Sequence, residues 1–238
     1  MGVSRSGARG SLTALVLTVL LCVGWLVGAS AAWAQDGAIG GRITTLAPAS
    51  AEPLTVTTNQ DVCGQTVPDE SVLVGPDGGL ANAVITVVGL APGVEASPIE
   101  VTNDGCRFVP RVQVSRPGAQ VDLTSADDVL HTSHAYAEDG RSLFNVAIPM
   151  AGLTITRALT ARGVVRLVCD THTWMRGFVV AAVDRAVVSA ADGSFRIDGV
   201  PPGTYELRFW HERLEAGTQT VTVTADGVTD VTVDMRES

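Results

Sequence analysis

After residue 34 the sequence alternates between apolar and polar residues with a period of two, in short runs separated by turn sequences. The runs lie at residues 85–88, 112–115, 121–124, 164–168, 178–183, 205–209, 220–223 and 231–234. The turns lie at residues 76–79, 116–118, 138–140, 191–193 and 201–203, each containing glycine. Period-two runs of this length predict strands, and their spacing favours a sandwich or barrel over a parallel α/β sheet. We expect an all-β protein with one short helix near residues 153–159.

The first 34 residues have the order of a secretory signal. Arg5 and Arg9 precede an almost uninterrupted apolar run at residues 12–27, and Ala32-Trp33-Ala34 forms a small-x-small cleavage site. The apolar run has the length of a signal core and is short for a membrane span. We therefore expect cleavage, a periplasmic or secreted protein, and no membrane attachment afterwards.

The charge of the exported part excludes one class of partner. All 25 acidic residues follow residue 34, with 14 of the 16 basic ones, which leaves a net charge of −11. Every basic residue is arginine, and they form no cluster. An acidic surface argues against nucleic acid binding. It would suit a cationic redox partner, although it serves solubility equally well.

The exported part divides into three stretches. Residues 35–96 are rich in glycine, alanine and proline, residues 97–183 contain most of the candidate metal ligands, and residues 184–238 carry a second all-β pattern. No charged or serine-rich linker separates the last two, so we expect them to pack together.

The strongest local motif is Cys169-x2-His172-x2-Met175. It lies between the strands predicted at residues 164–168 and 178–183, so it forms a loop that can bring three side chains together. A thiolate, an imidazole and a thioether select copper over hard cations, and a trigonal two-histidine, one-cysteine set with a distant methionine is the blue-copper arrangement. A second imidazole is needed, from His131 or, alternatively, His134. These two histidines are three residues apart and point to opposite faces of a strand, so only one is expected to bind.

The cysteine count supports this assignment. Cys22 leaves with the signal, and Cys63, Cys106 and Cys169 remain in an oxidising compartment. Because Cys169 lies in the metal-ligand motif, we predict a disulfide between Cys63 and Cys106. The competing pairing of Cys106 with Cys169 would destroy the metal site.

Residues 97–183 resemble the plastocyanin and amicyanin families of type 1 copper proteins. The resemblance rests on a strand followed by His131, and on the short amicyanin spacing from Cys169 to Met175; Thr132 stands where the families have asparagine. It implies a cupredoxin Greek-key sandwich that holds one type 1 copper through His131, Cys169, His172 and Met175. It also implies outer-sphere electron transfer through an exposed edge of His172. The whole chain is similar to exported bacterial cupredoxin-like proteins often labelled methylamine utilization protein.

Residues 190–210 resemble the carboxypeptidase regulatory-like module, a small transthyretin-like β-sandwich, through the pattern D-G-x-F-x-I-x-x-V-P-P-G-x-Y-x-L. The first strands of that module are missing after Val183, but similar sequence occurs at residues 39–43 and 79–87. We expect residues 35–96 to complete the C-terminal sandwich, with the cupredoxin inserted between the two parts. His211 is expected to be structural; it could also face the copper domain or form a weak second metal site.

Together these features predict that the protein is an exported electron carrier with an unidentified redox partner protein. Two alternatives remain: a copper protein for storage or delivery that uses the same ligands, and a metal-free structural β-protein in which the site is degenerate. We expect no enzyme, because the sequence has no nucleophile elbow, no phosphate loop and no dinuclear copper motif.

Overall fold

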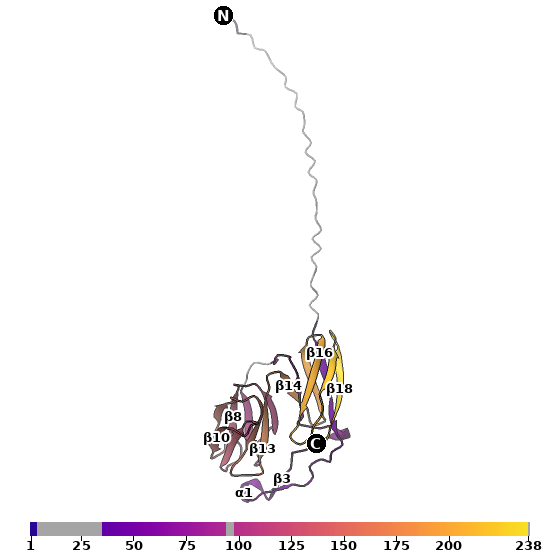
Figure 1. The fold of residues 1–238 in the computed structure, drawn as a ribbon. Coiled ribbons are helices and arrows are strands. Elements are labelled where there is room, and N and C mark those ends of the chain that lie inside the picture. Colours follow the sequence, from indigo (N-terminus) through magenta and orange to yellow (C-terminus); the bar gives the residue numbers. More distant parts are fainter. Residues whose placement is uncertain (4–34, 94–97, 238) are drawn as a thin grey trace. The chain divides into compact units, whose positions relative to one another are not determined.

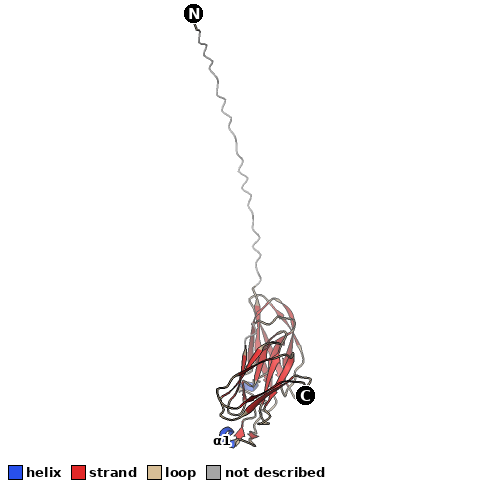
Figure 2. Cartoon of the chain, turned by 90° about the vertical axis from the view of Figure 1, so that its left-hand side faces the viewer, coloured by secondary structure: helices blue, strands red, loops and turns tan. Residues whose placement is uncertain are grey.

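A computed structural model describes residues 1–3, 35–93 and 98–237. Most of the predicted signal peptide, residues 4–34, lies outside this range. Strands make up almost all of the ordered structure in these residues, which confirms the all-β prediction (Figures 1 and 2). No helix within this part of the chain is long and apolar enough to cross a membrane.

The middle of the chain forms two sheets that enclose one core. The first sheet has, in spatial order, β10 (Ser142–Ile148), β9 (His131–Tyr136), β12 (Gly163–Val168), β13 (Arg176–Ala181) and β7 (Val112–Ser115). The second has β11 (Ile155–Ala158), β8 (Gln120–Ser125), β5 (Ile99–Asn103) and β6 (Phe108–Val109). Alternate residues of β8, β9 and β12 are buried, as the period-two pattern requires. We call this pair of sheets the metal-site sandwich.

The C-terminal strands form a second sandwich together with two strands from the N-terminal part. One sheet has β15 (Ser194–Val200), β1 (Gly37–Thr45) and β18 (Val228–Met235). The other has β14 (Arg185–Val188), β4 (Val84–Val87), β16 (Gly203–Trp210) and β17 (Gln219–Val223). The strand β1 lies antiparallel to β15 and parallel to β18, so chain segments almost 200 residues apart share hydrogen bonds.

Residues 54–67 form a separate small element that we call the cap. It consists of β2 (Leu54–Thr55), the short helix α1 (Gln60–Cys63) and β3 (Thr66–Val67), and it lies at one end of the fold (Figures 1 and 2). The 3-10 turn η1 (Pro76–Gly78) follows. Val56, Cys63 and Val67 are buried in the core of the metal-site sandwich, so the cap is packed onto it.

The predicted helix at residues 153–159 is wrong. Residues Ile155–Ala158 form β11, which pairs antiparallel with β8. Isoleucine and threonine are β-branched and favour extended backbone. A neighbouring strand that offers hydrogen bonds then decides the conformation of so short a segment.

The contacts that join the sandwiches include an aromatic pair and an ion pair. The rings of Phe178 and Trp210 lie 5.3 Å apart between centroids, within a small apolar cluster of both parts. Arg111 forms a bidentate ion pair with Glu212, in which Nη2 lies 2.9 Å from Oε2. Both side chains are largely buried, at 11% and 7% exposure, so water screens the pair little.

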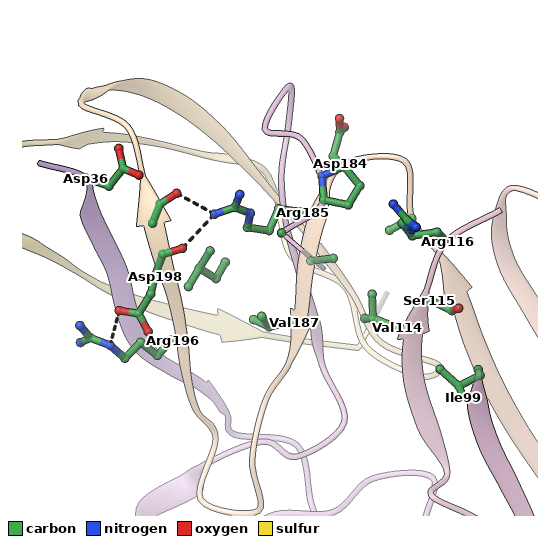
Figure 3. Close-up of a pocket in the computed structure, with 16 residues that line it drawn as sticks. Asp36, Ile99, Val114, Ser115, Arg116, Asp184, Arg185, Val187, Arg196 and Asp198 are labelled. Atoms are coloured by element: carbon green, nitrogen blue, oxygen red, sulfur yellow. Dashed lines mark hydrogen bonds and ion pairs between the residues drawn. The ribbon is translucent and has the colours of Figure 1, made fainter. Parts of the chain in front are cut away.

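A cavity of about 710 Å³ lies beside β14, near the start of the second sandwich (Figure 3). Arg185 extends across it and donates from Nη1 to the carbonyl oxygens of Asp198 and Gly199, at 2.9 and 2.7 Å. Arg196 pairs with Asp198 at its rim. These arginines are therefore already engaged by protein oxygens.

Candidate metal centre

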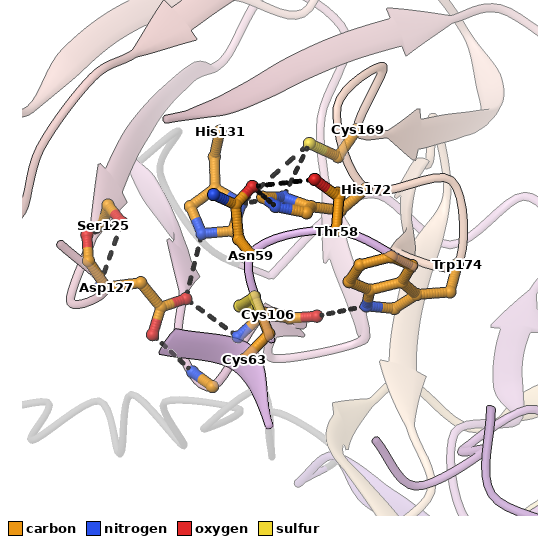
Figure 4. Close-up of a disulfide and its surroundings, with 11 residues drawn as sticks. Thr58, Asn59, Cys63, Cys106, Ser125, Asp127, His131, Cys169, His172 and Trp174 are labelled. Carbon is orange, nitrogen blue, oxygen red and sulfur yellow. Dashed lines mark hydrogen bonds and ion pairs between the residues drawn. A yellow bond between two sulfur atoms is a disulfide. The ribbon is translucent and has the colours of Figure 1, made fainter. Parts of the chain in front are cut away.

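Three of the predicted ligands meet at one buried point. Nδ1 of His131 lies 3.0 Å from Nδ1 of His172, and Sγ of Cys169 lies 3.9 and 3.6 Å from these two nitrogens (Figure 4). All three side chains are at least 98% buried. The structure therefore brings His131, Cys169 and His172 together, as the sequence predicts.

The sheet explains why residues so far apart in the chain converge. His131 begins β9, and Cys169 directly follows β12, the antiparallel neighbour of β9. The loop then turns back, with the backbone N–H of Met175 donating to the carbonyl of His172 at 2.9 Å. Met175 is buried in the same core cluster as Cys169, so its role as the axial ligand stays a prediction.

The spacing of these donors fits a metal ion. In a trigonal site with roughly 2.0 Å to nitrogen and 2.3 Å to sulfur, the donors lie about 3.5 to 3.7 Å apart. The three distances between the donors, 3.0, 3.6 and 3.9 Å, bracket this range. Small adjustments of the side chains would suffice to complete the set.

The outer nitrogens of both imidazoles are already engaged. Nε2 of His131 lies 3.0 Å from Oδ2 of Asp127, and Nε2 of His172 lies 3.1 Å from Oδ1 of Asn59. An amide or carboxylate oxygen only accepts, so each Nε2 carries a proton, and in a neutral imidazole Nδ1 then offers a lone pair. The two Nδ1 atoms lie 3.0 Å apart, so a proton or a metal ion shared between them relieves the repulsion of their lone pairs. The arrangement is therefore compatible with a cation site.

Asp127 also orders the backbone around the disulfide. Its carboxylate accepts from the backbone N–H groups of Gly105 and Cys106, both at 2.8 Å, in addition to His131. The disulfide between Cys63 and Cys106 is present, and Cys169 is a free, buried thiol. The predicted pairing is therefore confirmed, and the competing pairing of Cys106 with Cys169 is wrong.

Thr132 ties the ligand loop to β9. Its backbone N–H lies 3.3 Å from Sγ of Cys169, and its hydroxyl oxygen accepts from the backbone N–H of Asp170 at 2.7 Å. Burial opposes ionisation of the thiol, but the contact with the His131 ring, the backbone N–H and hydroxyl of Thr132 and the backbone N–H of His172 outweigh it, so the pKa of Cys169 is lowered. A lower pKa favours the thiolate, which is the form that binds metals.

His172 differs from the exposed histidine that the resemblance implies. It is fully buried, because Asn59 of the cap covers its Nε2 and Trp174 lies against its ring at 5.1 Å between centroids. Burial, reinforced by His131, lowers the pKa of His172 to about 4. At neutral pH the imidazole is therefore neutral and able to bind a metal. The expectation of an exposed edge is wrong, because it did not include a segment more than a hundred residues upstream.

The other two histidines lie elsewhere. His134 is on the opposite face of β9, where Nδ1 lies 3.2 Å from Asp170 and Nε2 lies 3.0 Å from the hydroxyl of Ser142. His211 is buried where the sandwiches meet, and its Nδ1 accepts from the backbone N–H of Arg213 at 3.3 Å. Neither belongs to the cluster of His131, Cys169 and His172.

Sequence reasoning missed Asp127 and Asn59. The spacing of Asp127 from His131 could have indicated its role, because a carboxylate four residues before a candidate ligand can orient an imidazole. No sequence pattern indicates the role of Asn59, which lies 113 positions before His172 and reaches it only through the folded cap.

A family model matches part of the chain. Residues 147–236 match the carboxypeptidase regulatory-like domain, so this part of the chain resembles that module as the sequence indicates. The match also includes β12 and β13, which lie in the metal-site sandwich. No curated protein sequence matches this chain.

Solved cupredoxin structures resemble part of the fold. A purple cupredoxin from Nitrosopumilus maritimus is 22% identical, with 34% of this chain and 97% of that one covered, at a TM-score of 0.30. Amicyanin from Paracoccus versutus is 17% identical, with 40% and 95% covered, at 0.30. A copper-containing nitrite reductase from Thermus scotoductus is 23% identical, with 40% and 24% covered, at 0.29. These structural similarities are too weak to indicate a function, which depends instead on the side chains of the site.

Proposed function

We propose that this protein is an exported mononuclear type 1 copper protein that carries electrons by outer-sphere transfer. The observation that carries the proposal is the convergence of two imidazole Nδ1 atoms and one thiol at a buried point, with the outer nitrogens of both imidazoles engaged. This donor set matches the blue-copper arrangement once Met175 is added as the distant fourth ligand.

His131 and His172 would hold copper through Nδ1, Cys169 through Sγ, and Met175 through its thioether. When bound, copper supplies a centre that gains and loses one electron between its +1 and +2 states. The chain contributes a fixed ligand set: Asp127, Asn59 and Thr132 hold the two imidazoles and the sulfur from outside. Side chains held in this way need little rearrangement when the charge of the centre changes.

The burial of the site favours a carrier over the other two functions. A delivery protein has to release its metal to another protein, whereas these donors lie beneath the cap. A structural β-protein has no use for a free thiol between two imidazoles. An enzyme needs an open position for substrate, and four protein ligands leave none, so we propose that the protein is not an enzyme.

The sequence supports a proposal for where the protein acts and for the charge of its redox partner. The signal at residues 1–34 would place the mature protein in the periplasm or outside the cell, where the disulfide persists. A separate redox protein would deliver or accept the electron. The net charge of the exported part favours a cationic surface on that partner.

The first test is the visible spectrum of the mature protein after addition of Cu(II). We expect an intense blue or purple thiolate-to-copper band that Cys169→Ser and His131→Ala abolish and that His134→Ala retains. Absence of the band in the unmodified protein would exclude a type 1 site. Loss of the band in His134→Ala and its retention in His131→Ala would instead reverse the choice of histidine.

A second measurement separates carrier from delivery protein. We expect the band to bleach with ascorbate and return with ferricyanide over repeated cycles, with copper content unchanged. Loss of copper to a dilute chelator during each reduced phase would favour delivery.

A further inference from the structure

The cap contacts His172 through the side chain of Asn59. Oδ1 of Asn59 lies 3.1 Å from Nε2 of His172, on the outer side of the imidazole. Asn59 has φ 54° and ψ 40°, a left-handed conformation that asparagine tolerates better than most residues. Its carbonyl accepts from the backbone N–H groups of Val62 and Cys63 and so begins α1. The backbone of Asn59 therefore starts the helix while its side chain points to His172.

The cap is anchored at the other end of α1. Cys63, the last residue of the helix, is bonded to Cys106. Sγ of Cys106 lies within 4.8 Å of a carboxylate oxygen of Asp127 and a ring nitrogen of His131. The carbonyl of Cys106 also accepts from Nε1 of Trp174, whose ring lies against His172. The disulfide therefore attaches the cap directly beside both histidines (Figure 4).

We propose that Asn59 is a positioning residue for His172, and that the Cys63–Cys106 disulfide holds the cap so that it closes the metal site. Asn59 selects the His172 tautomer with the proton on Nε2, which leaves Nδ1 free for the metal. It also occupies the space through which a chelator would reach that imidazole. The closure of the site by the cap rests on the proposed copper function. The positioning of His172 by Asn59 can be tested without metal.

The metal-free test is nitrogen-15 NMR of the histidine side chains at pH 8, where His172 is neutral. We expect the unmodified protein to show His172 with the proton on Nε2, and Asn59→Gly to show a mixture of tautomers. Glycine adopts the left-handed conformation freely, so this variant removes the side chain and keeps the backbone. Asn59→Asp, which retains an accepting oxygen, should restore the Nε2 tautomer. An unchanged tautomer in Asn59→Gly would overturn the positioning role, whether or not the protein binds copper.

The test of closure is the rate at which copper passes to an excess of EDTA. Loss of a residue that orients a metal-bound histidine weakens metal binding by about 10- to 100-fold. We expect Asn59→Gly to release copper about tenfold faster than the unmodified protein. Asp61→Asn is the matched control, because Asp61 lies exposed on the same helix, and it should leave the rate unchanged.

The disulfide is tested with the double variant Cys63→Ser/Cys106→Ser, checked for folding by circular dichroism. We expect it to release copper at least as fast as Asn59→Gly. A wild-type release rate in a folded double variant would overturn the role of the disulfide. A wild-type rate in Asn59→Gly would overturn closure by Asn59. Absence of the thiolate-to-copper band in the unmodified protein would contradict the copper function instead, and the NMR result would still decide the positioning role.

Discussion

The carboxylate of Asp127 lies 3.0 Å from Nε2 of His131, and this contact connects the metal site to the disulfide. The same carboxylate accepts from the backbone of Gly105 and Cys106. One side chain thus fixes the orientation of a candidate ligand and the position of the loop that anchors the cap. A carboxylate behind a metal-binding histidine also raises the basicity of the nitrogen that faces the metal.

Asp127→Ala should weaken copper binding by about 10- to 100-fold, because His131 loses the partner that fixes its tautomer. The measurement is a competition titration with a chelator of known affinity. Asp128→Ala is the matched control, since Asp128 is exposed and adjacent. Equal affinities in the two variants would show that Asp127 does not orient the ligand.

Thr132→Val should keep the backbone N–H bond to Cys169 and lose the hydroxyl that accepts from the N–H of Asp170. The N–H of Asp170 then loses its protein partner, and because this bond is exposed to water the loss costs about 0.5 to 1.5 kcal/mol of unfolding free energy. Chemical denaturation of the metal-free protein measures this cost. Thr132→Ser keeps the hydroxyl and should recover most of the lost stability; a Thr132→Val protein as stable as the parent would contradict the argument.

Removal of the disulfide should destabilise the fold by about 2 to 5 kcal/mol, because Cys63 and Cys106 close a long loop that becomes unconstrained in the unfolded chain. Urea denaturation of Cys63→Ala/Cys106→Ala beside the unmodified protein measures the difference. Comparable midpoints for the two proteins would mean that packing alone holds the cap.

Glu212→Gln should cost about 3 kcal/mol, since it leaves Arg111 as a largely buried charge without its partner. The double variant Arg111→Met/Glu212→Leu should be more stable than either single variant, because no unpaired charge remains. A double-mutant cycle made of Arg111→Met, Glu212→Leu and the double variant, measured by denaturation, gives the coupling energy between the two side chains. Additive effects would show that the ion pair contributes nothing to the junction of the sandwiches.

Stability should fall with pH between about 6.5 and 4. Burial, and then the neighbouring Arg111, lower the pKa of His211 to about 4, so the folded protein keeps this histidine neutral. In that pH range the unfolded chain binds a proton that the folded chain does not, and the free energy of unfolding decreases as pH falls.

His211→Gln tests this dependence in the metal-free protein. It should remove about 3 kcal/mol of the decrease between pH 7.5 and pH 4. The comparison is made within each protein across pH, which cancels any constant effect of the substitution. A pH profile identical to that of the parent would show that another group is responsible.

The chemistry of the site was readable from the sequence because it is local. Cys169, His172 and Met175 lie in one loop of seven residues between two runs that alternate with a period of two. The face of a strand follows from position alone, so the sequence predicted that only one of His131 and His134 reaches the site, and the structure decided that it is His131. The same alternation predicted most of the longer strands, but at residues 155–158 the neighbouring β8 overrode a weak helical expectation.

The sequence by itself determined the strand content, the candidate donor atoms and the cysteine left outside the disulfide, because each depends on residue type and nearby spacing. Only the tertiary structure decided that β1 lies between β15 and β18, that Asp127 holds His131, and that Asn59 covers His172. The contacts of β1 and Asn59 join residues more than a hundred positions apart. Such contacts form only when the whole chain buries its apolar surface, and no local pattern encodes which segments will then be neighbours.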